Sequence, residues 1–142
     1  MRARDPSVRR VVIDHINLPV RDLAASRTFY EAVLATLGFG VQESEGWVAF
    51  GPPGSEDFCL VDGDPGPAGT HVAFAAASRE EVHAFHAAAL AAGATDNGAP
   101  GTRETYSPTY YAAFVLDPDG HNIEAVFHEP TDGVSRRRRA RR

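Results

Sequence analysis

Two histidines and one glutamate, far apart along the chain, have the residue types of a metal site. His15 and His71 each lie in an apolar, strand-like stretch, and Glu124 interrupts the apolar run IEAVF. A lone carboxylate among buried apolar neighbours is costly unless a cation or a hydrogen-bond donor meets it. Two imidazoles and a carboxylate can hold a divalent metal and leave positions open for water or substrate. We therefore predict a metal site of His15, His71 and Glu124, in which Glu124 also acts in catalysis.

An internal repeat places these residues at matching positions of two similar halves. Apolar residues that follow His15 at fixed distances recur at the same distances after His71. Each half reads as a strand, a helix and about three further strands. We predict an α+β fold of two tandem βαβββ modules, residues 11–61 and 70–128 of a domain spanning 11–130. Their strands would form a cupped mixed sheet with the helices on the outside.

Capping and turn residues mark the ends of the expected elements. Asp22 is a helix N-cap, Gly38 a helix stop, and Ser78 opens a capping box. The DPDG sequence at 117–120 is a turn, and glycine and proline fill the connector 62–69. The expected strands are 11–20, 39–43, 47–50, 58–61, 70–77, 109–116 and 122–128, the expected helices are 23–37 and 79–92, and 94–108 is expected to be irregular.

Strand alternation predicts which face carries the chemistry. Successive side chains of a strand point to opposite faces, so Ile16 belongs to the side that faces a helix. His15, Asn17, His71 and Glu124 then belong to the opposite, concave face. Asn17 is accordingly a candidate for contact with a substrate.

Further candidates surround this predicted site. The segment GAPGTRETYSPTYY (98–111) is expected to form a mobile lid, because glycine and proline shape it. Within it, Arg103 could hold an anionic group of the substrate, and Tyr106 and Tyr110 could contact the substrate. His128 shares the concave face and is a candidate acid–base group at the rim.

Other polar and aromatic residues are expected to have structural roles. His83 and His86 lie three apart on a helix, but the outward position of that helix favours surface or packing roles over metal binding. His121 lies in a turn and is expected to face solvent. Trp47 and Phe50 are expected to belong to the core rather than to a substrate wall.

Composition narrows the classes of protein. The chain has 142 residues, of which 43% are hydrophobic and 23% charged, as suits one packed domain. No apolar run reaches the roughly 20 residues of a membrane span, and the charged N-terminus lacks a secretory core. We expect a soluble, cytoplasmic protein with no membrane partner. A single cysteine, Cys59, excludes an intrachain disulfide.

Charge is unevenly distributed along the chain. The formal net charge is −5, but six arginines lie in 136–142. Without them, eight arginines face nineteen acidic residues, which leaves a net charge of −11 on the rest of the chain. Residues 1–10 read as a leader and 131–142 as a basic tail, which is either solvated, the favoured reading, or attracted to nucleic acid or an anionic surface. The acidic remainder argues against nucleic acid as the main partner.

Three motifs carry a resemblance to a known family. They are DHINLPVRDLAASRTFYEAVLATLGF, GTHVAFAA and YYAAFVLDPDGHNIEAV. Through them, nearly all of residues 11–128 resemble the vicinal oxygen chelate superfamily, which includes glyoxalase I, the bleomycin-resistance proteins and the extradiol dioxygenases. The resemblance implies paired modules that hold one divalent metal, Fe, Mn, Ni, Zn or Co, on their first and last strands. Carried over to this chain, the implied ligands are His15, His71 and Glu124.

The sequence departs from the family's patterns at two positions. Metal-binding glyoxalases of the superfamily commonly have a fourth ligand, a glutamate, where the repeat places Cys59. The second carboxylate of a lactoylglutathione lyase is therefore missing, and Cys59 is either a zinc ligand or, preferably, a small core residue. Catechol-cleaving members resemble this chain in their three ligands, but they use a tyrosine near the position of Phe114.

The resemblance and the ligand set predict a divalent-metal-dependent enzyme that acts on a small-molecule substrate through vicinal oxygens. It would be a lyase, an isomerase or a dioxygenase. A homodimer is expected, in which either one chain or two supply the ligands. The alternative is a metal-free protein that binds a drug or another small molecule, and a third reading is an accessory protein without catalysis.

Overall fold

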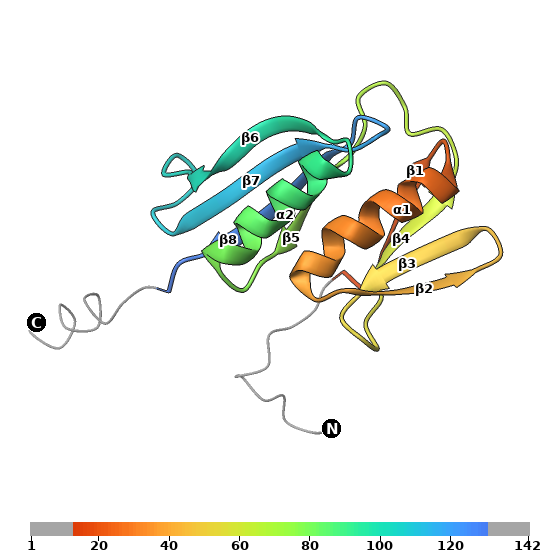
Figure 1. The fold of residues 1–142 in the computed structure, drawn as a ribbon, viewed down its shortest axis with the longest axis horizontal. Helices are drawn as coiled ribbons and strands as arrows, with labels where there is room; N and C mark the ends of the chain where they lie inside the picture. The colour runs from red at the N-terminus through yellow and green to blue at the C-terminus, as the bar shows by residue number, and fades with distance from the viewer. Residues whose placement is uncertain (1–12, 131–142) are drawn as a thin grey trace, which may run out of the picture.

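The structure is a computed structural model that describes residues 13–130. The expected leader, 1–10, and the basic tail, 131–142, lie outside the described residues. Within that range the chain forms two βαβββ modules (Figure 1). The elements are β1 (Ile16–Val20), α1 (Leu23–Leu34), the 3-10 helix η1 (Ala35–Leu37), β2 (Gly40–Ser44), β3 (Trp47–Gly51), β4 (Phe58–Asp62), β5 (His71–Ala75), α2 (Arg79–Ala91), β6 (Thr95–Thr102), β7 (Tyr110–Leu116) and β8 (Asn122–His128).

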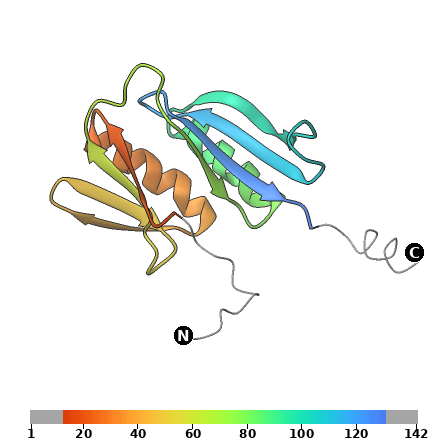
Figure 2. The same cartoon turned by 180° about the vertical axis from the view of Figure 1, so that it is seen from behind.

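The two modules have the same sheet topology. The strand order is β1-β4-β3-β2 in the first module and β5-β8-β7-β6 in the second. The parallel pairs are β1 with β4 and β5 with β8, which are the first and last strands of each module along the chain. The other neighbouring strands are antiparallel. Helices α1 and α2 lie side by side on one face of the sheets, and the other faces are seen from behind in Figure 2. The predicted α+β fold is thus confirmed, with its strands in two separate four-stranded sheets.

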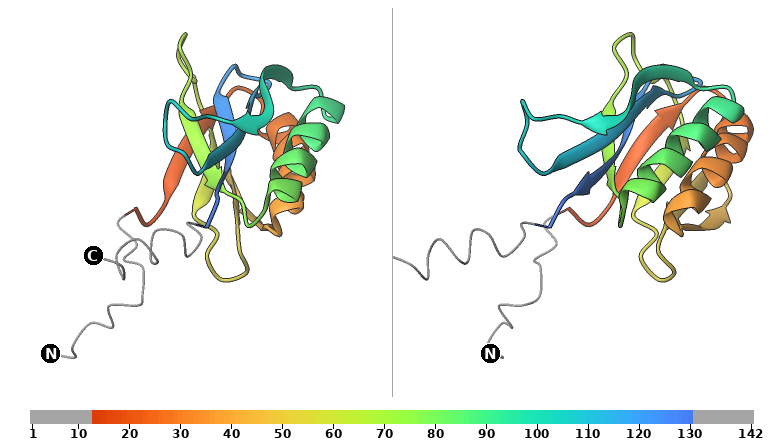
Figure 3. Two further views of the ribbon diagram at one scale, coloured as in Figure 1. Left: turned by 90° about the vertical axis from the view of Figure 1, so that its left-hand side faces the viewer. Right: turned by 60° about the vertical axis from the view of Figure 1, so that its left-hand side comes forward.

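One hydrophobic core lies between the helices and the sheets and is shared by both modules. Tyr30 of α1 and Phe85 of α2 are fully buried, and each such side chain stabilises the fold by about 2–3 kcal/mol. Phe74 of β5 packs edge-on against Phe58 of β4, with 4.9 Å between ring centroids, and against Phe39, at 5.8 Å. The two views of Figure 3 show the helices on one side of both sheets.

The predicted helix ends are confirmed. The Asp22 side chain accepts a hydrogen bond from the first turn of α1. Ser78 Oγ accepts the Glu81 N–H at 3.1 Å, and the Glu81 side chain reaches back to the N–H of Ala77, one residue before the N-cap, at 2.7 Å, in a variant of the capping box. Gly38 ends the first helical segment with φ of 78°, a left-handed conformation that favours glycine. None of the helices within 13–130 is long and apolar enough to cross a membrane.

The prediction of an irregular segment at 94–108 is wrong for residues 95–102. They form β6, an eight-residue edge strand whose register with β7 shifts between Asp96 and Gly98 and again between Gly98 and Gly101. Glycine, proline, aspartate and asparagine have low strand propensity, so the composition hides this strand. Bulges at a sheet edge tolerate these residues, because unpaired backbone groups there can reach water.

Two more sequence predictions need correction. The first strand begins at Ile16 rather than at residue 11, so that His15 precedes β1. Trp47 is not a core residue, since it is 38% exposed on the open face of the first sheet. Phe50 is buried as predicted.

The turn between β7 and β8 joins the second module to the first. Asp117 Oδ2 accepts a hydrogen bond of 2.5 Å from the hydroxyl of Tyr30 in α1. His121 accepts the Thr70 N–H at Nδ1, at 2.8 Å, and donates from Nε2 to the Pro19 carbonyl, at 2.9 Å. His121 is fully buried, so the prediction that it faces solvent is wrong. Its burial comes from Thr70 and Pro19, which are distant in sequence and therefore invisible to a local turn signal.

Candidate functional site

The candidate site begins with a contact between His71 and Glu124. Parallel pairing places His71 of β5 opposite Asn122 of β8, one pleat from Glu124. His71 Nε2 lies 3.0 Å from Glu124 Oε1, and His71 Nδ1 lies 2.9 Å from the carbonyl oxygen of Asn122. A carbonyl oxygen only accepts hydrogen bonds, so Nδ1 carries the proton. Nε2 is then the nitrogen that meets the carboxylate.

Glu124 is a buried carboxylate with two protein partners. The residue is 1% exposed, and its Oε2 accepts a hydrogen bond from the hydroxyl of Tyr110 on β7. Burial, followed by the hydrogen bond to Glu124, raises the pKa of Tyr110. The hydroxyl therefore remains a donor at neutral pH. The contacts with Tyr110 and His71 explain how an acidic residue is accommodated in an otherwise apolar strand.

The chemistry of this donor pair fits a shared cation. A neutral imidazole with its proton on Nδ1 presents a lone pair at Nε2, and Glu124 Oε1 presents another. Two acceptors 3.0 Å apart repel each other unless a proton or a metal ion lies between them. Donor atoms bound about 2.1 Å from one ion at a right angle lie about 3 Å apart. The pair His71 and Glu124 thus suits either an imidazolium–carboxylate pair or a metal with nitrogen and oxygen ligands.

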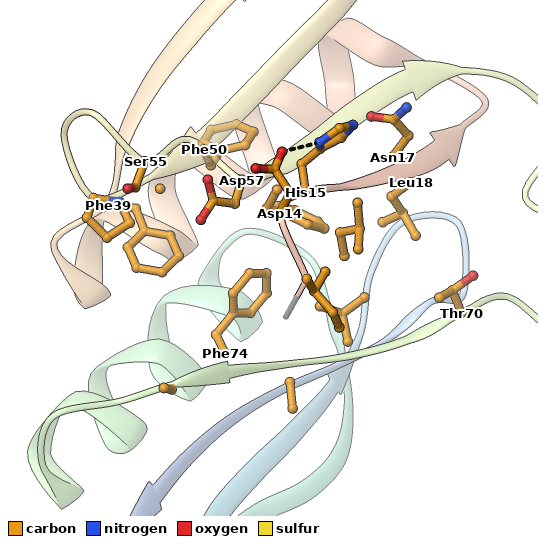
Figure 4. A pocket seen from close by; sticks show the side chains of 18 of the residues that line it. Asp14, His15, Asn17, Leu18, Phe39, Phe50, Ser55, Asp57, Thr70 and Phe74 are labelled. Carbon is orange, nitrogen blue, oxygen red and sulfur yellow. Dashed lines mark hydrogen bonds and ion pairs between the residues drawn. The ribbon is translucent and has the colours of Figure 1, made fainter. Parts of the chain in front are cut away.

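His15 lies apart from this pair. It is exposed, and its Nδ1 is 2.7 Å from Asp14 Oδ1. A cleft of about 770 Å³ separates β1 from β5, with His15 on one wall and Phe74 on the other (Figure 4). Among residues 13–130, the three predicted ligands do not form one cluster with metal-ligand spacing. The single chain therefore brings together only His71 and Glu124.

A different group with metal-ligand residue types lies in the β7–β8 turn. Asp117, Asp119 and His121 have ligand atoms within 4.8 Å of one another. Asp117 Oδ1 accepts the backbone N–H groups of Asp119 and His121, each at 2.9 Å. Both ring nitrogens of His121 are also engaged, so His121 has no lone pair left for an ion. This group does not fit a metal, and its contacts are those of a joint between the modules.

Aromatic side chains border Glu124 on the open face of the second sheet. The Tyr106 and Tyr110 rings have centroids 5.1 Å apart, and His128 meets Tyr110 edge-on at 5.2 Å. Tyr106 is 66% exposed, and His128 is exposed at the end of β8. Tyr110 thus contacts both the buried carboxylate and two exposed residues, and solvent or a substrate can reach those two residues.

Phe114 is a site residue that the sequence analysis misses. Its ring stacks with His71, at 6.1 Å between centroids, and the guanidinium of Arg103 lies 5.5 Å from the ring centroid. The sequence interpretation treats Phe114 only as a position without a hydroxyl. Its alternation with Tyr110 along β7, which puts both on one face, is the signal that could have found it.

Asn17 and Cys59 belong to the open face of the first sheet. They are register partners on β1 and β4, and with His15 and Trp47 they line a second cavity of about 340 Å³. Burial, with a smaller effect of Asp57, raises the pKa of the Cys59 thiol. In the absence of a metal the thiol therefore keeps its proton at neutral pH. Asn17 lies on the first module, while Glu124 lies on the second.

His83 and His86 are not gathered into a metal pair. His83 Nε2 lies 2.6 Å from the Tyr111 hydroxyl, and His86 Nε2 lies 3.0 Å from Asp96 Oδ1. The two histidines therefore have separate partners, in agreement with the packing roles expected for them.

Comparisons with known proteins show which proteins this chain is similar to. The family model described as "Glyoxalase/Bleomycin resistance protein/Dioxygenase superfamily" matches residues 12–125. A solved glyoxalase/bleomycin resistance protein from Albidiferax ferrireducens T118 is 34% identical, with a TM-score of 0.70 over 80% of this chain and 97% of that chain. No curated protein matches the chain.

Two more distant solved structures share the fold. A glyoxalase/bleomycin resistance protein/dioxygenase family enzyme from Burkholderia phytofirmans PsJN is 20% identical, with a TM-score of 0.65 over 82% of this chain and 98% of that chain. A glyoxalase/bleomycin resistance protein/dioxygenase from Nocardioides is 21% identical, with a TM-score of 0.60 over 89% of each chain.

Proposed function

Because the chain belongs to the glyoxalase/bleomycin resistance protein/dioxygenase superfamily, we propose that it is a divalent-metal-dependent enzyme acting on a small molecule through two vicinal oxygens. The observation that supports this most is the contact of His71 Nε2 with Glu124 Oε1 at 3.0 Å. The Asn122 carbonyl directs a lone pair of His71 at a buried carboxylate, an arrangement that calls for a cation. Fe, Mn, Ni, Zn and Co all accept such ligands.

In this proposal the chain's own residues position the ligands and move protons. A bound metal would supply positive charge that stabilises an oxyanion developing on the substrate. The Asn122 carbonyl fixes the tautomer and the ring orientation of His71. Tyr110 holds Oε2 of Glu124 and leaves Oε1 directed at His71. Glu124 is the proposed proton acceptor, and His128, exposed beside Tyr110, is the proposed group that exchanges protons with solvent.

We further propose that His15 completes the ligand set from a second copy of the chain. Strands β1 and β5 are both edge strands, so each has one side without a strand partner in the described chain. Unpaired strand edges readily pair with another chain. In a homodimer, β1 of one copy would approach β5 of the other and bring His15 and Asn17 to His71 and Glu124.

Metal binding by Glu124→Gln tests the proposed function. The metal-free wild-type protein should bind about one equivalent of Ni(II), Zn(II) or Mn(II), and its melting temperature should rise. At 1,000 times the Kd the stabilisation is about 4 kcal/mol. Glu124→Gln keeps the shape and an acceptor for Tyr110, so it should fold and lose most of this rise. His83→Gln, a histidine substitution on α2, should keep it.

An equal response of wild type and Glu124→Gln, or no response of either, would contradict the proposal. The contact would then be an imidazolium–carboxylate pair. Metal-free binding of a drug or another small molecule would become the better function for this chain.

A further inference from the structure

We infer that the substrate of this site carries a carboxylate group and that Arg103 binds it. The inference rests on the proposed function, because it places the oxygens of the same substrate at His71 and Glu124. The ligand class is a small organic acid with a flat body that lies across Phe114.

Arg103 differs from the other arginines of the described range. The other three each pair with a carboxylate, whereas Arg103 forms no ion pair with an acidic residue among 13–130. The pairs are Arg21 with Asp119, Arg27 with Glu31 and Glu43, and Arg79 with Glu129. A guanidinium without a carboxylate partner, beside a candidate site, is suited to bind an anion from solution.

The guanidinium of Arg103 is fixed before any ligand arrives. Its Nη2 donates to the Ala99 carbonyl at 2.7 Å, and its Nη1 lies 3.5 Å from the Thr102 carbonyl. Its Cζ lies 5.5 Å from the centroid of the Phe114 ring. These contacts use a minority of the five N–H donors and leave the others for a ligand. A side chain that is already ordered loses little entropy on binding.

The glycines of β6 make room for this arrangement. A Cβ on Gly98 would lie 3.0 Å from Phe114 Cδ2 and 3.2 Å from Arg103 Nη2, and a Cβ on Gly101 would lie 3.0 Å from Arg103 Nη1. Gly98 also has φ of 149°, a value that L side chains rarely adopt. The bulged, glycine-containing strand therefore fits around the guanidinium, and a larger residue at either position would displace it.

Phe114 connects Arg103 to the proposed metal ligands. Its ring stacks with His71 at 6.1 Å, and its backbone is the register partner of Glu124. The backbone N–H of Arg103 also donates to the backbone carbonyl of Tyr110, at 2.8 Å, and the Tyr110 hydroxyl donates to Glu124. A substrate that places two oxygens at His71 and Glu124 and covers Phe114 would thus direct its far end to Arg103. The planar guanidinium suits a carboxylate, which it can bind with two parallel hydrogen bonds.

A matched pair of probes tests this inference. We choose 3,4-dihydroxybenzoate and 3,4-dihydroxybenzamide, which share two vicinal oxygens and a shape and differ in charge. Titration calorimetry with Zn(II)-loaded wild-type protein should show that the acid binds about 10- to 100-fold more tightly than the amide, as expected for a charge-assisted hydrogen-bonded pair. Arg103→Gln should abolish this preference, and the control Arg27→Gln should keep it.

The same samples separate this inference from the proposed function. The metal-induced rise in melting temperature should be unchanged in Arg103→Gln, because Arg103 is not a proposed ligand. If that rise is present but wild type fails to prefer the acid, or Arg103→Gln keeps the preference, the inference alone is overturned. If metal has no effect but the preference depends on Arg103 in the metal-free protein, the carboxylate site stands and the metal-dependent function fails.

Discussion

Glu124 illustrates how one residue of a core strand can carry chemistry. Its neighbours Ile123 and Ala125 are fully buried on the helix-facing side, while Glu124 points to the opposite face. There it meets a phenol and an imidazole instead of water. A buried carboxylate is tolerated when its oxygens are hydrogen-bonded, and leaving one oxygen without its partner is costly.

Tyr110→Phe should therefore destabilise the protein by about 1–2 kcal/mol at pH 8, because it removes the donor to Glu124. The effect should depend on pH. The pKa of Tyr110 is raised above 10.0 in the folded protein, so its stabilising effect is complete below about pH 10 and is lost as the pH rises further. Urea unfolding of both proteins at pH 8 and pH 11 should show that their difference shrinks. A constant difference would contradict this assignment.

At the scale of elements, the β7–β8 turn acts as a joint between modules. Asp117 accepts hydrogen bonds from its own turn and from Tyr30 of α1, and it is 5% exposed. Burial, followed by the charge of Asp117, raises the pKa of the Tyr30 hydroxyl, which therefore remains a donor. His121 adds bonds to the end of β1 and to the residue before β5. The joint thus fixes the position of the two sheets relative to each other, and with it the shape of the cleft between them.

Tyr30→Phe should cost about 1–3 kcal/mol of unfolding free energy, since it leaves the buried Oδ2 of Asp117 without its donor, while Oδ1 keeps its two backbone donors. Tyr111→Phe is the matched control, because the Tyr111 hydroxyl meets the exposed side chain of His83 rather than a buried carboxylate. Its loss should cost less than about 1 kcal/mol. Equal losses for the two variants in urea unfolding would show that the Tyr30 bond does not carry the joint.

For the whole molecule, the division of the predicted ligands between two modules is the central feature. His71 and Glu124 meet on the second sheet, whereas His15 lies across a cleft on the first. The cleft is bordered by β1 and β5, the two edge strands that face each other's module. The proposed homodimer would join such edges between copies and bring the three ligands together.

Mixing two inactive variants tests whether the site spans two copies. His15→Ala and Glu124→Gln should each bind metal poorly on their own. If sites form between copies, refolding an equal mixture should restore about a quarter of the wild-type metal sites, since half of the dimers are mixed and one of their two sites is intact. No restoration, with dimers present by light scattering, would instead assign all ligands to one chain.

Much of the fold follows from the sequence because its signals are local. Asp22 and Ser78 mark helix starts through hydrogen bonds within a few residues, and the repeat sets the order of the elements. Alternation along β5 and β8 places His71 and Glu124 on one face, because the period of a strand is two residues. The strand β6 is not recognisable in this way, since its glycines and proline suit bulges rather than regular pairing.

The sequence by itself determined the two modules, their elements other than β6, and the faces on which the chemically active residues lie, because each depends on short-range periodicity. Only the tertiary structure decided which of those residues meet. It placed Phe114 in contact with both His71 and Arg103, buried His121 against residues far away in sequence, and left His15 outside the contact between His71 and Glu124. Such contacts depend on sheet register and on how the modules pack, and these are set by the sum of many distant side chains.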